Sequence, residues 1–522
     1  MEQDAAVKVL LIDPPFYRLI GFYNRYFPLG LLSVGTFLRK RGHDVVVYDA
    51  DYNERPRAMD YTRLPDYYPG YLSALGQRDH PVWREVRETI RRVGPDVIGV
   101  SVWTTYAAAA FRVAELAKEI APGCPVVAGG PHATARAEET LRIAPAVDYV
   151  VRGDGELPTA ALLDTIAGDR GKLEAVAGLS YRDDERIRHN PNRSRIRDLD
   201  ELPTPDRNLL LNAAHYSSED MGLIVTSRGC PFSCSFCATN TRQVRYRSID
   251  RVVVEIREVK ARYGTTQFSL KDDSFTVDHH RVRRFCDALL RENLHIVWEC
   301  NTRVDLVTED MLARMKHAGC NSVKVGIESG SPEILERMNK GITLTHARVA
   351  ASLLRKSGIH WTGYFLMGTP GETLDDVYRT LDFMYEIRPD FASIGVYEPF
   401  PGSATFHEGV QRGLFRPQMT MDDFYNTLPN HYYKVDPGRQ LDTIEPEQFV
   451  LLEREMKARF HAYNNHYKRL LNRVRSRTMH YIRSPRALYG DFQKYLCWRQ
   501  GQTELTPSEP YAASGRSRRR YE

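Results

Sequence analysis

Runs rich in Val and Ile alternate with stretches of helical apolar spacing through the first 167 residues. The runs predict five strands, at residues 7–13, 44–50, 96–102, 125–130 and 147–153. The stretches between them place apolar residues at intervals of three and four and end near Gly or Pro, at residues 29–42, 82–94, 107–121 and 135–144. Because strands that alternate with helices form a parallel sheet with crossover helices, residues 1–167 are predicted to fold as a doubly wound, Rossmann-like α/β domain.

A second alternating series follows a polar segment at residues 168–220, which we interpret as a linker with one hairpin. Six strands are predicted in this series, at residues 221–229, 265–273, 295–301, 321–329, 360–368 and 391–397. Helical patterns separate them, so a (β/α)6 partial TIM barrel is predicted over residues 221–400. The alternation then stops, and the sequence favours a helical C-terminal region at 401–505 and a disordered basic tail at 506–522.

Composition narrows the class of protein. A length of 522 residues supports several domains, and 42% hydrophobic with 27% charged residues is ordinary for an α/β protein. No run of about 18 apolar residues appears, so no membrane span is predicted. The first residues lack the apolar core and cleavage site of a secretion signal, so we expect a cytoplasmic protein. The net charge of +5 is small, and the Arg-rich end favours a disordered tail over a nucleic-acid site.

Three of the eight cysteines, Cys230, Cys234 and Cys237, lie within one window of eight residues. Chance alone would place about 0.12 cysteines in such a window. Cytoplasmic thiols stay reduced, and clustered ones more often hold metal than form disulfides. The loop follows the first strand of the second series, at the strand end where barrel sites are built. The pattern therefore predicts a metal site there.

The absence of a fourth ligand nearby separates two kinds of metal site. A structural zinc site normally has four ligands, so zinc is disfavoured. A cubic four-iron cluster needs a ligand on each iron, so three thiolates leave one iron open to another molecule. We therefore predict a [4Fe-4S] cluster that delivers single electrons to a substrate or cofactor.

The CxxxCxxC motif, with Phe236 before its last cysteine, resembles that of the radical S-adenosylmethionine (SAM) enzymes, and the resemblance covers residues 220–400. It implies that Cys230, Cys234 and Cys237 hold the cluster and that Phe236 lies near the adenine of SAM. It also implies that the open iron binds the amino and carboxylate groups of SAM, whose reductive cleavage gives a hydrogen-abstracting 5′-deoxyadenosyl radical. An external one-electron reductant of the flavodoxin or ferredoxin type is the expected partner.

Polar residues end the other strands of this series, where the same resemblance implies contacts with SAM. Asp272 and Asp273 are assigned to the amine of SAM, and Arg303 is assigned to its carboxylate. Glu328 and Ser329 are assigned to the ribose, and a segment that contains Gly368 and Glu372 is assigned to the adenine. A carboxylate suits the cationic amine and a guanidinium suits the carboxylate. Helix capping is the alternative role for the acidic residues, because Asp and Glu also cap helices after barrel strands.

The first predicted domain carries its own set of strand-end loops. An open parallel sheet binds ligands beyond the carboxyl ends of its strands, and none of these loops has the GxGxxG of a dinucleotide site. As a set, DPP, SVWTTY, GGPHAT and RGDGE resemble the cobalamin-binding domain that precedes the barrel in one subclass of radical SAM enzymes, over residues 7–165. The implied cobalamin contacts are Asp13, Pro14, Ser101, Trp103, Thr104, Thr105, Gly129, Gly130, His132, Gly153, Gly155 and Glu156.

This chain lacks the DxHxxG motif that ligates cobalt through histidine in mutases and methionine synthase. The subclass resembled here generally lacks it too, so Ser101, Trp103, Thr104 and Thr105 are candidates for the lower cobalt face and the nucleotide tail. His132 opens a helix after GGP, which favours a backbone-positioning or polar contact over cobalt ligation. The glycines allow a flat cofactor to approach the backbone closely.

These resemblances imply methylation of an unactivated carbon of a small-molecule or natural-product substrate. Within the subclass, the alternative is to close, contract or oxidise a ring without net methylation, and the sequence does not separate the two. Methylthiotransferases hold a second cluster on three cysteines of their first domain, whereas residues 1–220 contain only Cys124. A cofactor sensor that binds nucleic acid remains an alternative and would need a folded basic face.

Overall fold

The computed structural model describes residues 6–22, 27–52, 61–168, 170–192, 195–239, 241–435, 441–466 and 469. The chain divides into two compact units, residues 1–446 and residues 447–522. The predicted basic tail at 506–522, and residues 467–505 of the predicted helical region apart from 469, lie outside the described residues.

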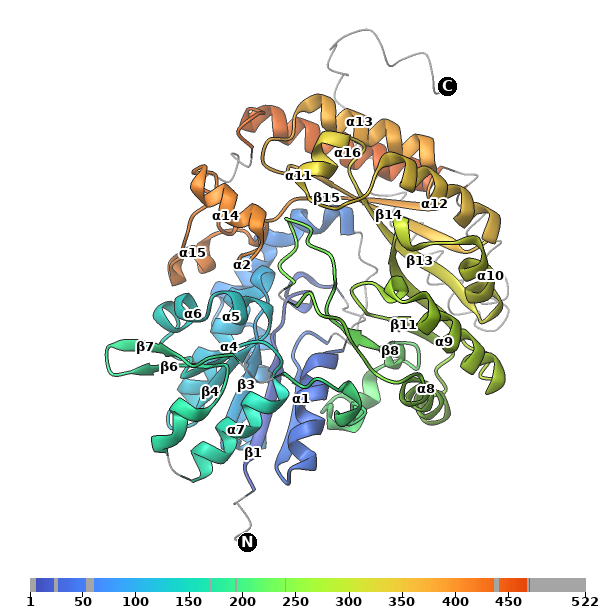
Figure 1. Ribbon diagram of the computed structural model, residues 1–522. Helices are drawn as coiled ribbons and strands as arrows, with labels where there is room; N and C mark the ends of the chain where they lie inside the picture. The colour runs from blue at the N-terminus through green and yellow to red at the C-terminus, as the bar shows by residue number, and fades with distance from the viewer. Residues whose placement is uncertain are drawn as a thin grey trace. The chain divides into compact units, whose positions relative to one another are not determined.

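A seven-stranded sheet organises the N-terminal part of the first unit (Figure 1). Its order is β2-β1-β3-β4-β5-β6-β7, and the first five strands are parallel. The strands are β1 (Lys8–Asp13), β2 (Asp44–Asp49), β3 (Val97–Ser101), β4 (Val126–Gly129), β5 (Tyr149–Val151), β6 (Leu179–Asp183) and β7 (Arg186–His189). The five predicted strands and the doubly wound fold are confirmed. The hairpin β6–β7, expected in the linker, extends the sheet antiparallel to β5.

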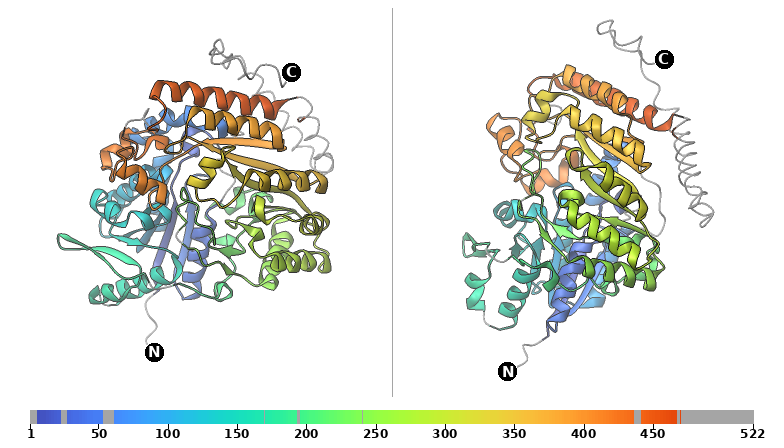
Figure 2. Two further views of the ribbon diagram at one scale, coloured as in Figure 1. Left: turned by 45° about the horizontal axis from the view of Figure 1, so that its top comes forward. Right: turned by 45° about the vertical axis from the view of Figure 1, so that its right-hand side comes forward.

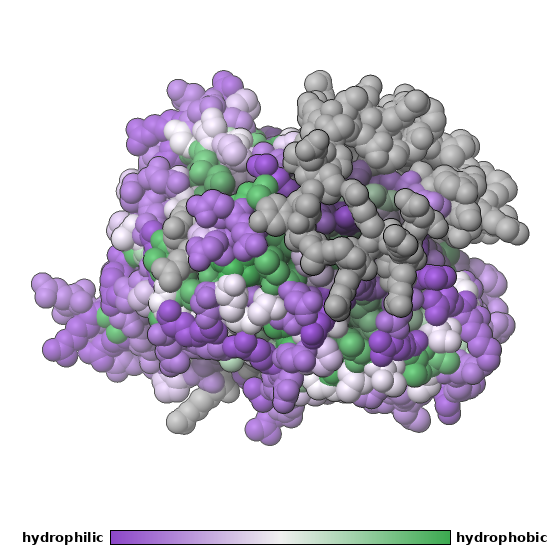
Figure 3. Space-filling view, turned by 90° about the horizontal axis from the view of Figure 1, so that it is seen from above, coloured by the Kyte–Doolittle hydropathy of each residue, from purple (hydrophilic) through white to green (hydrophobic). Residues whose placement is uncertain are grey.

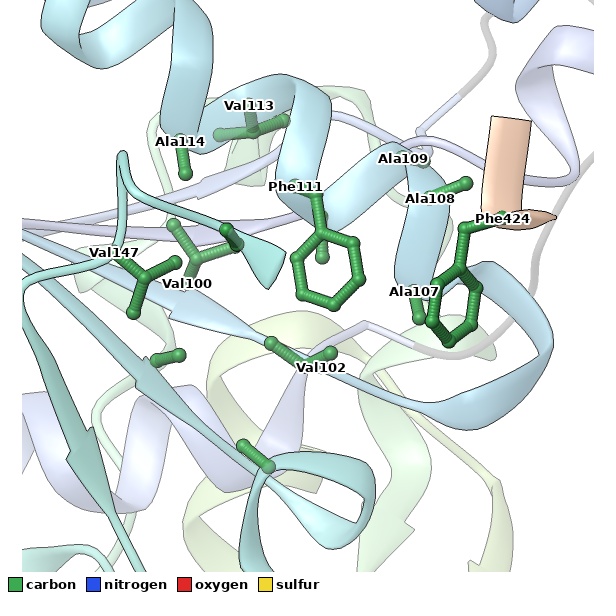
Figure 4. Packing of buried hydrophobic residues seen from close by; sticks show 14 of the residues in the cluster. Val100, Val102, Ala107, Ala108, Ala109, Phe111, Val113, Ala114, Val147 and Phe424 are labelled. Atoms are coloured by element: carbon green, nitrogen blue, oxygen red, sulfur yellow. The ribbon is translucent and has the colours of Figure 1, made fainter. Parts of the chain in front are cut away.

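Helices cover this sheet in the order that the sequence predicts, with two additions. The predicted helices are α1 (Leu29–Lys40), α3 (Pro81–Val93), α4 (Ala107–Ile120) and α6 (Ala137–Ile143), followed by α7 (Glu156–Ala167). Helix α2 (Tyr68–Gly76) has no counterpart among the predicted helices, and α5 (Pro131–Ala135), which contains His132 as expected, is separate from α6. Helix α4 enters the core on Ala107, Ala108, Ala109 and Ala110, all buried, because small side chains let its backbone approach the strands (Figure 4).

A six-stranded parallel sheet forms the second half of the first unit, in the order β15-β14-β13-β12-β11-β8. The strands are β8 (Leu223–Ile224), β11 (Gln267–Leu270), β12 (Val297–Arg303), β13 (Cys320–Glu328), β14 (His360–Met367) and β15 (Phe391–Val396). Buried and half-buried residues alternate along β13 and β14, so one face packs under helices and the other faces the barrel interior. The predicted partial barrel is confirmed.

Helices cover the outer face of this sheet (Figure 2). They are α8 (Ile249–Tyr263), α9 (His279–Arg291), α10 (Glu309–His317), α12 (Leu344–Ser357) and α13 (Leu374–Ile387). Each begins after a Ser, Thr or Asp whose side chain accepts a hydrogen bond from a backbone N–H of the first turn. These caps fix the length of the preceding loops, and the loops carry the candidate site residues.

A short antiparallel ribbon, absent from the sequence prediction, lies between β8 and β11 in the chain. It pairs β9 (Ser227–Arg228) with β10 (Arg245–Tyr246), and Arg228 lies directly opposite Arg245. The two arms of the ribbon flank the cysteine loop, so its position determines where that loop stands.

The segment after the barrel returns to the first domain. Helices α14 (Ala404–Gln411) and α15 (Met421–Asn426) contribute Phe406 and Phe424 to the same buried cluster as Phe111 of α4. The rings of Phe424 and Phe111 meet edge to face at 5.4 Å between centroids (Figure 4). One hydrophobic core therefore holds the N-terminal domain and residues 397–433 together.

The second unit contributes the helix α16 (Pro446–Asn465) to the described residues. Among the helices of the described residues, none combines the length and the apolar composition that crossing a membrane requires. On the face drawn in Figure 3, hydrophilic residues predominate and hydrophobic ones form smaller patches between them.

Candidate functional site

The cysteine loop begins two residues after β9, beyond the carboxyl end of β8. Cys230 and Cys234 are half-buried and Cys237 is exposed. At the root of the loop the Cys230 N–H donates to the Thr241 carbonyl at 3.0 Å. Gly229 has a φ of +99°, and a Cβ there would meet the Gln243 carbonyl at 2.6 Å, so only glycine fits this close approach.

The far side of the loop is bonded to the barrel and to α14. The Ser235 N–H donates to the Met338 carbonyl at 2.8 Å, and the Asn339 side chain donates to the Ser233 carbonyl at 2.9 Å. The Thr405 N–H donates to the Ser235 carbonyl at 2.9 Å. The loop therefore does not depend on its own short sequence for its shape, because three separate segments hold it.

Neighbouring thiols and charged side chains both affect the pKa values of the thiols in this loop. Burial raises the pKa of Cys230, and Asp273, Cys237 and Cys234 raise it further. Burial also raises the pKa of Cys234, but Lys340 and Arg303 oppose that rise. The Arg303 Nη1 lies 3.8 Å from the Cys234 sulfur. Two cations beside a thiol favour its thiolate form, which is the form that ligates iron.

This donor set fits a cluster better than a single ion. A tetrahedral zinc ion would draw its ligand atoms within about 4 Å of one another, since Zn–S is about 2.3 Å. Within the described parts of the chain, no three His, Cys, Asp or Glu side chains are grouped to hold one metal ion. Each thiolate of an iron–sulfur cluster binds a different iron, so the three thiols need only share one region, and all three lie on the one loop of residues 230–237.

Asp272 and Asp273 occupy different environments although they are neighbours. Asp272 is buried and accepts from the Thr226 N–H at 2.6 Å, the Thr226 hydroxyl at 2.5 Å and the Ser227 hydroxyl at 2.7 Å. It thereby ties β11 to the strand end that leads into the ribbon. Asp273 is exposed, yet burial by surrounding groups and then Asp272 raise the pKa of its carboxyl. Of the two carboxylates, Asp273 is therefore the one that remains accessible at this strand end.

Arg303 ends β12, and its contacts reach the cysteine loop and the turn that contains Lys340. Its Nε lies 3.0 Å from the Asp305 carboxylate, and its Nη2 donates to the Lys340 carbonyl at 2.6 Å. Its guanidinium stacks 3.6 Å from the Phe232 ring centroid, inside the cysteine loop. Arg303 therefore positions the loop as well as supplying charge.

Glu328, at the end of β13, forms an ion pair with Lys340; Lys340 is buried and Glu328 is half-buried. Glu328 has a left-handed φ of +67°, which turns it out of the strand. A Cβ on Gly326 would come 2.7 Å from the Lys340 Nζ and would overlap the Glu328 carboxylate. Lys340 also stands 5.8 Å from the Phe236 ring centroid. The sequence analysis missed Lys340, because it lies in a turn after α11 (Pro332–Arg337) and no strand-end pattern marks it.

Ser329 and the turn after β14 are arranged more for structure than for contact with a ligand. Ser329 is fully buried, and its hydroxyl lies 3.1 Å from the Thr380 hydroxyl. Glu372 is fully buried and accepts from the Gly368 N–H at 2.5 Å and the Thr369 N–H at 3.1 Å. Burial raises the pKa of Glu372 to about 7.

The strand order of the first sheet reverses between β1 and β3, and ligands of such sheets bind at that switch point. Asp13 and Pro14 end β1 there and are buried. Burial, followed by Asp49 and Asp51, raises the pKa of Asp13 well above its ordinary value. Ser101 and Thr105 are half-buried, and Trp103 is 50% exposed although it is a large apolar side chain. The switch point therefore presents the exposed indole of Trp103 after β3, and the buried carboxyl of Asp13 ends the neighbouring strand β1.

His132 lies inside the protein core and not in the crevice. It is 1% exposed, and its Nδ1 lies 3.2 Å from the Thr104 hydroxyl. Its ring packs against Phe111 and Phe424. Burial lowers its pKa to about 3, so the imidazole is neutral. This placement agrees with the expected positioning role, and it engages Thr104 as well.

In the GGP and RGDGE turns, glycines allow close packing against other segments of this chain. A Cβ on Gly130 would meet the Val102 carbonyl at 2.9 Å, whereas Gly129, half-buried at the end of β4, has its carbonyl bonded to the Val102 N–H at 2.7 Å. A Cβ on Gly153 would meet the Asn192 side chain at 2.8 Å, and one on Gly155 would meet a Val34 methyl group at 2.9 Å.

Glu156 is directed at the ribbon beneath the cysteine loop. Its carboxylate is buried and accepts from both Nη groups of Arg228, at 2.6 and 3.1 Å, and from the Ser33 hydroxyl at 2.6 Å. These donors lower its pKa against the effect of burial. We therefore assign Glu156 to the contact between the domains and not to a ligand. No local pattern indicates this pairing, because 72 residues separate the partners.

Comparison with known proteins gives matches over both halves of the first unit. The Radical SAM superfamily model matches residues 224–384, and the B12 binding domain model matches residues 19–163. The chain is 31% identical to "Uncharacterized methyltransferase PH0819" of Pyrococcus horikoshii, over 87% of this chain and 92% of the relative. It is also 31% identical to the anaerobic magnesium-protoporphyrin IX monomethyl ester cyclase of Rubrivivax gelatinosus, over 66% of this chain and 65% of that relative.

Solved structures share the fold at lower identity. The radical SAM methyltransferase TsrM of Kitasatospora setae, with cobalamin and a [4Fe-4S] cluster bound, matches with a TM-score of 0.59 at 18% identity, over 80% of each chain. The cobalamin-dependent radical enzyme OxsB, with aqua-cobalamin and SAM bound, matches with a TM-score of 0.58 at 19% identity, over 87% of this chain and 62% of that one.

Proposed function

This chain belongs to the cobalamin-dependent radical SAM enzymes, and from that premise we propose that it is a C-methyltransferase that acts on an unactivated carbon of a small molecule or natural product. The cofactors of the family are cobalamin, a [4Fe-4S] cluster and SAM. When bound, they supply a transferable methyl group and a radical that removes a hydrogen atom from the substrate.

The residues proposed to hold the cluster are Cys230, Cys234 and Cys237, with Lys340 and Arg303 favouring the thiolate form of Cys234. Their charges are close enough to act on one sulfur, and a thiolate is the form that an iron requires. The pKa of the Cys234 thiol therefore depends on the barrel, since both cations come from barrel segments.

Asp273 is the carboxylate proposed to face the SAM amine, because Asp272 has its oxygens occupied by Thr226 and Ser227. A cation placed beside Asp273 would oppose the effects that raise the pKa of its carboxyl, and it would thereby favour the ionised form. Glu328 stays a candidate for the ribose hydroxyls beside its Lys340 partner.

Cobalamin is proposed to lie over the switch point of the first sheet, between Asp13 and Pro14 on one side and Ser101, Trp103 and Thr105 on the other. Trp103 offers a flat apolar face to a flat macrocycle, and its exposure leaves that face available. Gly129, at the end of β4, is the remaining candidate on this side. The buried His132 and the ion-paired Glu156 are left out.

One observation carries the proposal of methyl transfer. The turn after β5 and the ribbon after β8 are bonded to each other through Glu156 and Arg228 at 2.6 Å, and both lie at the carboxyl ends of their sheets. Parallel sheets bind ligands at those ends, so the two proposed cofactor regions border one compartment. A methyl donor and a hydrogen-abstracting radical must reach the same carbon, which such a shared compartment supports.

Anaerobic incubation with methyl-labelled SAM, a strong one-electron reductant and a candidate substrate tests the proposal. Label in the product, together with both S-adenosylhomocysteine and 5′-deoxyadenosine, is the expected result. Formation of 5′-deoxyadenosine with a cyclised or oxidised product free of label would overturn methyl transfer in favour of the cyclase alternative, for which the Rubrivivax relative speaks.

The proposal also includes the source of electrons and the location of the protein in the cell. A flavodoxin- or ferredoxin-type protein is proposed to supply electrons, because the exposed Cys237 places one side of the thiol set near solvent. The reduced thiols that the cluster requires support a cytoplasmic location. Absence of 5′-deoxyadenosine under strong reductant would favour the sensor alternative.

A further inference from the structure

Four charged side chains join the two domains directly beneath the cysteine loop. Arg228 and Arg245 come from the two arms of the ribbon, and Asp154 and Glu156 come from the turn after β5. We call this group the interdomain joint. The turn supplies both carboxylates of the joint and the ribbon supplies both guanidinium groups. The joint therefore exists only when the turn and the ribbon are together.

The joint is well bonded and largely withdrawn from solvent. Arg228 binds Glu156 through two hydrogen bonds, at 2.6 and 3.1 Å, and lies 3.6 Å from Asp154. Arg245 binds Asp154 at 2.6 Å and also donates to the Ile196 carbonyl at 2.7 Å. The side chains of Glu156 and Arg245 are 2% and 6% exposed. Bidentate pairs of this kind fix orientation as well as distance.

The ribbon is unfavourable without the turn. Arg228 and Arg245 stand directly opposite each other, and like charges in that position destabilise a two-stranded ribbon. An isolated two-stranded ribbon is also marginal in water, and this one has two residues in each strand. The carboxylates of Asp154 and Glu156 remove the repulsion, so the ribbon adopts its observed pairing because the turn stands beside it.

The two ends of the joint lead to the two cofactor regions. Cys230 follows Arg228 by two residues, and the Thr241 carbonyl that holds Cys230 lies on the arm that leads to Arg245. The turn stands at the carboxyl end of β5, in the sheet whose switch point is proposed to hold cobalamin. A change in the order of the turn therefore changes the order of the cluster loop.

We infer that the interdomain joint couples the binding of cobalamin to the binding of the cluster, so that each group raises the affinity of the protein for the other. The inference rests on the proposed function, because it takes the two cofactor regions as given. Coupling of this kind is reciprocal, so one affinity ratio measures it from either side. Asp154, Glu156, Arg228 and Arg245 are positioning residues, since they act through the ribbon and the turn.

Equilibrium dialysis of the full chain against hydroxocobalamin, read out as bound cobalt, measures the coupling without turnover. The dissociation constant is determined for protein reconstituted with the cluster and for protein from which iron has been removed. We expect binding to be on the order of tenfold tighter with the cluster present. Equal dissociation constants for the two forms would overturn the inference.

Glu156→Gln tests the joint itself and is expected to bring the affinity ratio close to one. Should Glu156→Gln fail to fold, Asp154→Asn replaces a more exposed carboxylate, at 19% exposure, with the same expectation. Asp310→Asn, which breaks an exposed ion pair with Arg283 at 3.0 Å, is the matched control and should keep the wild-type ratio. A full wild-type ratio in a folded joint variant would overturn the inference.

Hydrogen exchange gives a second readout that a merely structural role would not move. Addition of hydroxocobalamin to the wild-type protein should slow exchange in residues 226–246, and Glu156→Gln should abolish that response. Exchange of residues 226–246 that is indifferent to cobalamin in the wild-type protein would contradict the coupling. Failure of the wild-type chain to bind cobalamin or a cluster at all would overturn the proposed function instead, so the two failures are distinguishable.

Discussion

Replacement of Glu372 by glutamine should stabilise the protein at alkaline pH while changing the dependence of its stability on pH. Glu372 is fully buried in the turn after β14, where one carboxylate oxygen accepts from the Gly368 and Thr369 N–H groups. Among the described residues, its other oxygen has no hydrogen-bond partner. An ionised carboxylate in such a place is poorly compensated.

The magnitude follows from the pKa. Burial raises the pKa of Glu372 from an ordinary value of 4.5 to about 7. Between these values the folded protein binds more protons than the unfolded chain, so stability is fully present below pH 4.5 and falls as pH rises through 7. Linkage gives a loss of about 2.5 kcal/mol in the free energy of unfolding between pH 5 and pH 8. Glu372→Gln keeps an acceptor for both N–H groups and removes this loss.

Thermal or urea unfolding of the apoprotein at intervals from pH 5 to pH 8 measures the effect as the difference between variant and wild type. The difference should grow by about 2.5 kcal/mol in favour of Glu372→Gln across that range. The same substitution at Glu336, which is exposed on α11, is the control and should give a flat difference. A difference for Glu372→Gln that stays constant with pH would refute the reasoning.

Three further predictions concern the site. Lys340→Met should lower the free energy of unfolding in urea by about 1 to 3 kcal/mol, because it leaves the half-buried Glu328 carboxylate without its cation. The double variant with Glu328→Gln should recover part of that loss, and no recovery would contradict the charge argument. Cys234→Ser should bring iron content after anaerobic reconstitution well below about four atoms per chain, whereas Cys124→Ser should keep it, and equal contents would exclude Cys234 as a ligand. Trp103→Ala should change the free energy of unfolding by less than about 0.5 kcal/mol, since the side chain is half exposed. In dialysis, the same variant should bind hydroxocobalamin on the order of tenfold more weakly, and an unchanged affinity would remove Trp103 from the cobalamin site.

The placement of side chains at strand ends shows where prediction from sequence reached its limit. Asp272 and Asp273 look equivalent in the chain, and both were expected to face SAM. Both follow the end of β11 at Leu270, where strand alternation no longer fixes the direction of a side chain. Asp272 is buried and accepts from the Thr226 N–H, whereas Asp273 is exposed. The sequence does not show which of the two carboxylates finds partners, because those partners come from another strand end.

The interdomain joint shows a different limit. Arg228 and Arg245 belong to two-residue strands, which leave no periodic signal, and their carboxylate partners lie far away in the chain. The same applies to Lys340, whose partner Glu328 ends a strand while Lys340 itself lies in a turn. Pairs of this kind are created by the meeting of separate segments.

The sequence by itself determined the two parallel sheets and the three-thiol loop, because period, element length and cysteine spacing are local properties of the chain. The tertiary structure alone decided that the segment with Phe424 packs onto the first domain, that His132 is buried, and that Glu156 binds Arg228. Those outcomes depend on which distant surfaces exclude water together, and burial then sets the charge state and the partner of each polar group.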